Sequence, residues 1–256
     1  MMETSMRIGA RWAGTIIVIR NYALIVMILA LGGIFVITRD AQADDKPVVI
    51  ASFSTSIDGQ DENVKQNIMI ACSKIDGIVI SPRSLISFNE IVGEGSAKNG
   101  FAPGRVLYRD QVVMEPGGGL CQVSSTLYNA LLMAGCVIVE RHRHFQPVTY
   151  VPLGLDATIK YGKKDLRMRN PHAVSLRIEL RADDASLRAV VSAERKIPHR
   201  YEIATEEEEV PLPSAGEMDR IRPGMMVHVY RKRYRGDVLQ ENSLLYRDYY
   251  QPAYIR

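Results

Sequence analysis

The sequence has no internal repeat, few cysteines and little net charge, and the last two shortages each argue against a class of protein. Three cysteines among 256 residues allow at most one intramolecular disulfide, which excludes a disulfide-rich scaffold. The 32 Lys and Arg residues against 29 Asp and Glu give a formal net charge of +3. So small an excess argues against a nucleic-acid binder, because such affinity depends mainly on phosphate contacts. An apolar content of 46% and a charged content of 24% are typical of a globular protein.

An apolar run is the main feature of the first 43 residues. Residues 22–37 carry no charged side chain. The run is short for a membrane-spanning helix of roughly 20 residues, and it fits a signal-peptide core. Ala41-Gln42-Ala43 is a small-x-small triplet of the kind that signal peptidase cleaves, although Arg39 and Asp40 precede it. We therefore predict an N-terminal hydrophobic helix that is a cleaved signal or a retained membrane anchor, with a buried core helix as a third reading.

The arginines around this run predict its orientation. Arg7, Arg11 and Arg20 precede the run, whereas only Arg39 follows it. Because the more positive flank stays in the cytoplasm, we expect the chain after residue 43 to lie outside it. The protein is then membrane-anchored or exported.

The remaining pattern predicts an α+β fold with a mixed, mainly antiparallel sheet and a few helices. Apolar residues at helical spacing predict helices over 61–76 and 120–134. Short apolar or alternating runs predict strands over 48–53, 78–80, 86–88, 136–139, 157–161, 166–169, 174–180 and 187–192, and hairpins over 104–114 and 225–245. We expect an irregular loop over 89–104 and divide the chain into segments 1–43, 48–195, 196–220 and 221–256. The acidic run 206–209 belongs to the third segment, a solvated linker, and the fourth is a small appended β unit.

The sharpest local feature is a run of three glycines that precedes a cysteine at a predicted helix start. Gly117, Gly118 and Gly119 can make tight turns and leave backbone N–H groups pointing at one spot. Cys121 falls in the first helical turn, where the helix dipole lowers a thiol pKa. The same N–H groups, with the Gln122 amide, could stabilise an oxyanion. The competing reading is a packed cysteine at an ordinary helix start.

The other two cysteines lie in apolar patterns. Cys72 shares a helical stripe with Val64, Ile68 and Ile75, and Cys136 begins an apolar strand. We expect both to be core residues. Cys121 and Cys136 would be roughly 20 Å apart along the helix, too far for a disulfide.

A thiolate nucleophile needs a base, and two histidines follow the strand after Cys136. His142 and His144 alternate on an extended stretch, so they are expected to face one way, with Arg141 and Arg143 facing the other. The competing readings are a solvated basic edge and a zinc site with Cys121. Asp156 is the first candidate to orient the base, and Glu140 is the second.

These motifs together resemble the VanW family. The segment 117–129, GGGLCQVSSTLYN, resembles the family signature. The resemblance continues through Glu140-Arg141 with His144, an ER-x-x-H element, and through 150–158, a Y-V-P-x-G-x-D-A-T element. It extends over roughly residues 48–195, including Asn67-Ile68, Pro82, Phe88-Asn89, Tyr161-Gly162 and 165–170.

Two positions depart from the family pattern. Phe145 stands where the family usually has Ser after the His, and Ser125-Thr126 stands where two threonines are common. Only His144 falls on the family's His, so the resemblance favours His144 over His142 as the base.

The resemblance implies an extracytoplasmic cell-wall protein of a mostly Gram-positive group. Some members are linked to L,D-transpeptidase-type crosslinking of peptidoglycan stem peptides, with the Cys of this element as nucleophile. We accordingly expect Cys121 as nucleophile, His144 as base, Asp156 as orienting group and Gln122 as oxyanion donor. The residues expected to contact substrate are Gly117, Gly118, Gly119, Ser124, Ser125 and His142.

The expected partners are peptidoglycan stem peptides and, through the N-terminal helix, the membrane. No cofactor, metal or nucleic acid is expected. The alternative is a non-catalytic peptidoglycan-binding or glycopeptide-resistance accessory domain.

Overall fold

The computed structural model describes residues 26–30, 33–37, 47–108, 111–210 and 220–254. The chain divides into two compact units, residues 1–45 and 46–256, and each is considered by itself.

The described part of the first unit is a hairpin. β1 (Val26–Ala30) pairs antiparallel with β2 (Gly33–Ile37), so the expected hydrophobic helix is not what the structure shows there. The β-branched and aromatic residues of both segments favour strands, and Gly33 weakens a helix. The triplet 41–43 lies outside the described residues. Among the described residues, no helix is long and apolar enough to cross a membrane.

A four-stranded antiparallel sheet forms the centre of the second unit. Its strand order is β3 (Val48–Ser56), β11 (Ser186–Ala193), β10 (Leu176–Ala182) and β4 (Val79–Ile80). Along β10 the apolar side chains Leu176, Ile178 and Leu180 are buried and alternate with more exposed residues, as the sequence predicts. The sheet therefore provides an apolar face for the helices.

Two long helices pack on this sheet. α1 (Glu62–Ile75) begins where the Asp61 carboxylate accepts a hydrogen bond from the Val64 N–H at 2.9 Å, and it buries the predicted stripe. α3 (Leu120–Met133) is buried along nearly its whole length. α1 packs on β10 and α3 on β3 and β11, while the helices contact each other. Both helices are confirmed within about one residue of the predicted ends.

Smaller elements surround this core. A second sheet has the order β5 (Leu85–Ser87), β9 (Arg167–Arg169) and β8 (Val137–Glu140), and a hairpin pairs β6 (Pro103–Tyr108) with β7 (Gln111–Pro116). The predicted loop 89–104 contains part of α2 (Phe88–Val92) and a 3-10 turn over Ala97–Asn99. Residues 157–161 form no strand; their one described ladder contact is a bridge between Lys160 and Lys164.

The C-terminal region forms a third sheet, which consists of the predicted hairpin and a strand from the segment that was expected to be a linker. Its order is β12 (Arg200–Val210), β14 (Gly224–Arg235) and β15 (Val238–Tyr250), and β13 (Arg220–Arg222) pairs with β16 (Ala253–Tyr254). The acidic run 206–209 is exposed, as expected, but it belongs to β12, because it pairs with β14 from Met225 to His228.

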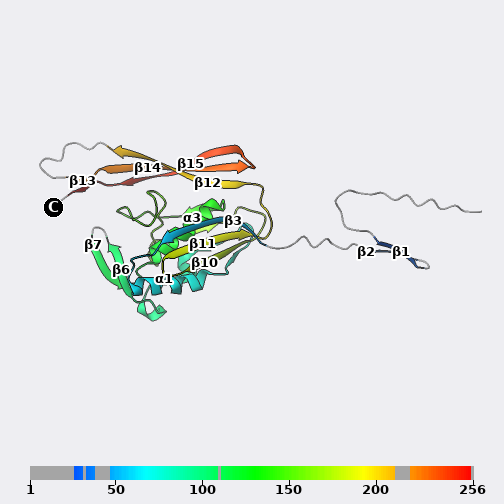
Figure 1. Ribbon diagram of the computed structural model, residues 1–256, viewed down its shortest axis with the longest axis horizontal. Helices are drawn as coiled ribbons and strands as arrows, with labels where there is room; N and C mark the ends of the chain where they lie inside the picture. The colour runs from blue at the N-terminus through cyan, green and yellow to red at the C-terminus, as the bar shows by residue number, and fades with distance from the viewer. Residues whose placement is uncertain (1–25, 31–32, 38–46, 109–110, 211–219, 255–256) are drawn as a thin grey trace, which may run out of the picture. The chain divides into compact units, whose positions relative to one another are not determined.

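This third sheet packs on the rest of the second unit. Val227, Val229 and Tyr250 form a small buried cluster with Val151 and Leu155. Figure 1 shows the sheet as a yellow-to-red layer along the α3 side of the unit, with α1 on the opposite side. The segment 141–158 bonds both to α3 and to the C-terminal sheet, and it carries His142, His144 and Asp156 of the predicted site.

Candidate functional site: a cysteine, histidine and aspartate cluster

Cys121 lies in the first turn of α3, as the sequence predicts. Gly119 caps the helix with φ of +99°, a left-handed conformation that favours glycine. The sulfur of Cys121 lies 3.5 Å from the Thr158 hydroxyl oxygen and 3.7 Å from the Ile159 carbonyl oxygen. The helix N-terminus and the Thr158 hydroxyl can both stabilise a thiolate there.

Asp156 holds His144 at two points. The carboxylate oxygen Oδ2 of Asp156 lies 2.6 Å from His144 Nδ1 and accepts a second hydrogen bond from the His144 backbone N–H, also at 2.6 Å. His144 is only 8% exposed and Asp156 only 1%. The bond at Nδ1 leaves the opposite ring nitrogen, Nε2, for Cys121.

The charges of Cys121 and His144 stabilise each other. Burial raises the pKa of the Cys121 thiol. The hydrogen bond and the charge of His144 outweigh this effect, so the pKa lies below its usual 9.0. Burial lowers the pKa of His144, but its hydrogen bonds with Asp156 and Cys121 raise it to about 9. Both shifts favour a thiolate–imidazolium pair, which is the reactive form of a cysteine site.

Arg141 and Tyr250 fix the second oxygen of Asp156. Asp156 Oδ1 accepts hydrogen bonds from Arg141 at 3.0 Å and from the Tyr250 hydroxyl at 2.8 Å. Burial raises the pKa of Asp156, but the hydrogen bond with His144 and the charge of Arg141 hold it below its usual 3.8. Arg141 also pairs with Asp248 at 2.6 Å. The carboxylate is therefore ionised and tied to β15.

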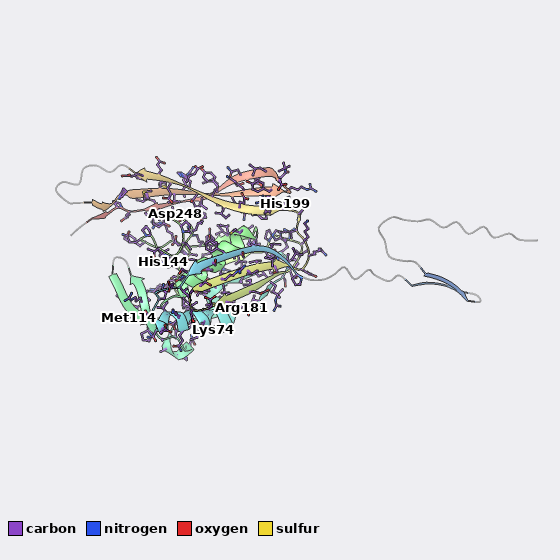
Figure 2. All side chains as sticks on the ribbon, in the orientation of Figure 1. Lys74, Met114, His144, Arg181, His199 and Asp248 are labelled. Carbon is purple, nitrogen blue, oxygen red and sulfur yellow. The ribbon has the colours of Figure 1, made fainter. Side chains whose placement is uncertain are left out.

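Tyrosine rings enclose Arg141. Its guanidinium lies 4.6 Å from the Tyr246 ring centroid and 5.7 Å from that of Tyr128. The hydroxyl oxygens of these tyrosines lie 2.5 Å apart and join α3 to β15. Figure 2 shows Asp248 on the C-terminal sheet and His144 on the part of the unit that faces it.

Sequence reasoning missed Arg141, Tyr250 and Asp248. Alternation along a strand would place Arg141 on the opposite side from His144, but β8 ends at Glu140, so this alternation does not extend to these residues. Tyr250 and Asp248 are about ninety residues or more from their partners, and no local signal marks them. The arginine of the ER-x-x-H element was the available hint.

His142 is not brought to the cysteine. Its Nε2 lies 2.9 Å from the Glu140 carboxylate, and its side chain is 37% exposed. The expectation that both histidines face one site is therefore not what the structure shows. The zinc alternative needed both histidines beside Cys121, and no cluster of three such ligands occurs in the described part of the chain.

The Gln122 amide is occupied away from the sulfur. Its Nε2 donates to the Thr55 hydroxyl at 3.0 Å and to the Ser56 carbonyl at 2.7 Å, and its Oε1 lies 3.3 Å from the Gln60 amide nitrogen. The side chain is 2% exposed. Gln122 therefore joins α3 to the end of β3, and these bonds replace the predicted oxyanion contact.

Ser124 and Ser125 anchor the segment that follows Asp156. The Ser125 hydroxyl donates to the Cys121 carbonyl at 2.7 Å and accepts from the Ala157 N–H at 2.9 Å. The Ser124 hydroxyl bonds to the Ala157 carbonyl. Both side chains are fully buried, so the contacts that they make are internal rather than with substrate.

The backbone of the glycine loop, residues 117–119, lies in close contact with neighbouring segments. A Cβ at Gly118 would lie 2.6 Å from the carbonyl carbon of Gly104, and one at Gly119 would lie 3.0 Å from Val64 and Ile68. The Asn67 amide donates to the Gly118 carbonyl at 3.0 Å. Gly117 has φ of +87°. Close packing against Gly95, Gly104 and α1 therefore accounts for these glycines, which were expected to contact substrate.

Tyr150 is a further residue at the site that sequence reasoning did not single out. Its ring meets the His144 ring edge to face, with centroids 6.4 Å apart. Its hydroxyl oxygen is enclosed and has no hydrogen-bond partner of ordinary geometry among the described residues. Burial, and then the negative charge of Cys121, raise the pKa of Tyr150 well above 10.0, so the hydroxyl keeps its proton.

Together these features define an α+β protein with a cysteine, histidine and aspartate cluster at a helix N-terminus. Residues 63–192, just over half of the chain, match the family described as VanW like protein. The chain belongs to the VanW family.

Two proteins that are similar to this chain are known by name. One is the uncharacterized protein YoaR of Bacillus subtilis (strain 168), 35% identical over 123 residues, which are 48% of this chain and 41% of that protein. Another is the vancomycin B-type resistance protein VanW of Enterococcus faecalis (strain ATCC 700802 / V583), 28% identical over 148 residues, which are 56% of this chain and 54% of that protein. The chain thus covers about half or less of each relative. No solved structure matches.

Proposed function

We propose that this protein is a cysteine acyltransferase of the L,D-transpeptidase type that acts on peptidoglycan stem peptides outside the cytoplasm. The observation that carries the proposal is the interaction of Cys121, at a helix N-terminus, with a His144 that Asp156 orients. A nucleophile, its base and an orienting group are the parts that covalent acyl transfer requires. The VanW resemblance of the surrounding motifs supports the wall peptide as substrate.

The cluster can perform both halves of the transfer. The Cys121 thiolate attacks a donor peptide carbonyl and forms a C–S bond, while the C–N bond breaks and the leaving amine takes the proton of His144. An acceptor amine then attacks the thioester and forms a C–N bond. The C–S bond breaks, the thiolate returns, and His144 takes the proton that the acceptor amine loses.

The oxyanion of each step needs donors other than Gln122. The N–H groups of Leu120, Gln122 and Val123 bond to carbonyls of the glycine loop. The proposal therefore assigns the oxyanion to the N–H of Cys121 and to the neutral hydroxyl of Tyr150. Donors fixed before the reaction stabilise the developing charge without reorganising.

Export is part of the proposal, and it rests on the N-terminal sequence. Arg7, Arg11 and Arg20 precede the apolar run 22–37 and favour a cytoplasmic N-terminus. A C-terminal fusion to a reporter that is active only outside the cytoplasm should give signal. Signal from a reporter active only in the cytoplasm would refute export.

Mass spectrometry of the purified full chain tests the reaction. Incubation with a synthetic stem tetrapeptide should give an acyl adduct that maps to Cys121. Cys121→Ala should give none, and the matched variant Cys72→Ala, which removes a buried thiol, should keep the adduct. An adduct on another residue, or none with any stem peptide, would contradict the proposal.

A second candidate function follows from the name of one relative, a vancomycin B-type resistance protein. In this alternative the domain binds wall peptide without reacting and contributes to glycopeptide resistance. A Cys121→Ser variant that binds purified wall and fully restores the phenotype of a deletion strain would favour it. Loss of the phenotype with retained wall binding would favour the enzyme.

A further inference from the structure

A polar cleft of about 490 Å³ opens next to the segment that contacts the Cys121 sulfur. Ile159 contacts the sulfur, and Tyr161, two residues on, lines the cleft. Two residues of extended chain span about 7 Å at most, so the cleft begins close to the reacting atom. It has the size of a small-molecule or peptide subsite.

One wall of this cleft is a turn held by backbone hydrogen bonds. The Lys160 N–H donates to the Lys164 carbonyl at 2.9 Å, and the Asn89 amide donates to the same carbonyl at 2.9 Å. The next N–H, of Asp165, donates to the Glu140 carboxylate at 2.9 Å. These bonds tie the turn to α2 and β8, so the side chains on it leave from a fixed backbone.

The cleft has more unpaired cations than unpaired carboxylates. Lys163 and Lys164 are exposed, and neither forms an ion pair within the part of the chain that the structure describes. Arg167 is half-buried and lies across the β8–β9 pair from Glu140, whose pKa is lowered by the hydrogen bond with His142 and also by the charge of Arg167. The lining carboxylates of Glu140 and Asp165 instead accept hydrogen bonds from neighbouring side-chain and backbone groups. Cationic side chains that are not neutralised by an ion pair favour an anionic ligand.

We propose that this cleft binds a free carboxylate of the peptide substrate, held by Lys163, Lys164 and Arg167, while the reacting carbonyl lies at Cys121. The inference rests on the proposed function for the identity of the ligand. Glu90, an exposed carboxylate that also lines the cleft, disfavours a multiply charged anion such as phosphate. Tyr161, 54% exposed at the cleft, offers an apolar surface to the peptide chain.

Binding without chemistry tests this subsite. In the full chain with Cys121→Ala, a stem peptide with free carboxylates should bind by calorimetry. The same peptide with its carboxylates amidated should bind about tenfold to a hundredfold more weakly, the scale of a charge-assisted hydrogen bond. Lys163→Glu with Lys164→Glu should weaken binding of the free peptide similarly. The matched pair Lys98→Glu with Lys196→Glu, exposed lysines outside the cleft, should not.

Three outcomes would overturn the subsite. The amidated peptide could bind as well as the free one, or the control pair could weaken binding as much as the cleft pair. Inorganic phosphate, titrated alone, could bind more tightly than the peptide, which would make the cleft a phosphate site.

Failure of the subsite and failure of the reaction are distinguishable. If the peptide binds the cleft as expected but wild-type protein forms no acyl adduct, the transferase proposal fails and the subsite stands. If the adduct forms at Cys121 but amidation leaves its rate and the affinity unchanged, the reaction stands and the subsite fails.

Discussion

The hydroxyl of Tyr250 donates a hydrogen bond to Oδ1 of Asp156 over 2.8 Å, although 94 residues separate the two. The same hydroxyl accepts the N–H of Gly154 at 3.1 Å. Because Asp156 holds His144 through its other oxygen, a C-terminal tyrosine helps to fix the imidazole at the cysteine. The C-terminal sheet is thus a structural part of the site.

Cys121 should be the one fast-reacting thiol in the folded protein. Burial raises the pKa of both Cys72 and Cys136 to about 12, whereas His144 lowers that of Cys121 below 9.0. Brief alkylation near neutral pH followed by mass mapping should find the label on Cys121. The pH midpoint of its labelling rate should lie below 9.0 and rise in His144→Ala. Label mainly on Cys72 would refute the assignment.

His144 and His142 should differ sharply in their effect on turnover. His144→Ala should lower the rate of adduct formation by about 10²–10⁴, the usual scale for a positioned base. His142→Ala should cost much less, because His142 pairs with Glu140 instead. Asp156→Asn should fall between them, since it leaves the imidazole in place but less well oriented. Circular dichroism checks that each variant is folded, and equal rates for the two histidine variants would contradict the site.

Arg141 should be among the most important residues for stability. Arg141→Met leaves Asp248 buried without its cation and leaves Asp156 with His144 alone, and we expect urea unfolding to show a loss of about 3–5 kcal/mol. The control Arg181→Met, at a pair whose arginine is 75% exposed, should cost about 0–1 kcal/mol. Tyr250→Phe should cost about 1–3 kcal/mol by leaving the groups that it bonds unpaired. A loss at Arg141 no larger than at Arg181 would disprove this role.

The lowered pKa of Asp156 predicts a loss of stability in acid. Its pKa is lowered on folding, so its contribution is complete above 3.8, the ordinary value, and is lost as pH falls through the folded pKa. Protonation would leave the cations of Arg141 and His144 without their shared carboxylate. The difference in unfolding free energy between wild type and Asp156→Asn should shrink as pH falls below about 4. A difference that does not change with pH would exclude this linkage.

Gly118→Ala should destabilise the fold, because the new Cβ would lie 2.6 Å from the Gly104 backbone. Overpacking of this kind costs typically about 1–3 kcal/mol. Gly100→Ala is the control: its Cβ meets nothing within 4 Å, and its φ of +86° alone costs about 1–2 kcal/mol. Thermal unfolding measures both. A stable Gly118→Ala that fails only in peptide binding would restore a direct substrate contact for this loop.

The predictable part of the site was its local part. Helical spacing predicted α1 and α3, and the glycine run before Cys121 predicted a thiol at a helix start, where the structure has it. The motif resemblance singled out His144 and Asp156, which the fold brings to within 2.6 Å of each other. Each of these signals lies within a few residues of the group it concerns.

The rest depended on contacts between distant segments or on the buried side of a helix. Gln122 and Ser125 looked like ligand-facing polar groups because their position next to Cys121 does not reveal that α3 is covered on nearly every side. Their amide and hydroxyl bond instead to β3 and to the chain at Ala157. The hairpin of β14 and β15 was predicted, whereas the strand β12 was expected to be part of a linker, and its pairing with β14 has no local signal.

The four glutamates of the acidic run have a consequence for how molecules of this protein meet one another. β12 is an outer strand of its sheet, and outer strands can pair with a strand of a second molecule and begin aggregation. Residues 206–209 are consecutive and exposed, so their carboxylates point alternately from both faces. A second copy docking edge to edge would set like charges directly opposite, which is unfavourable. The run that resembles a linker in sequence therefore disfavours pairing between the β12 edges of two molecules.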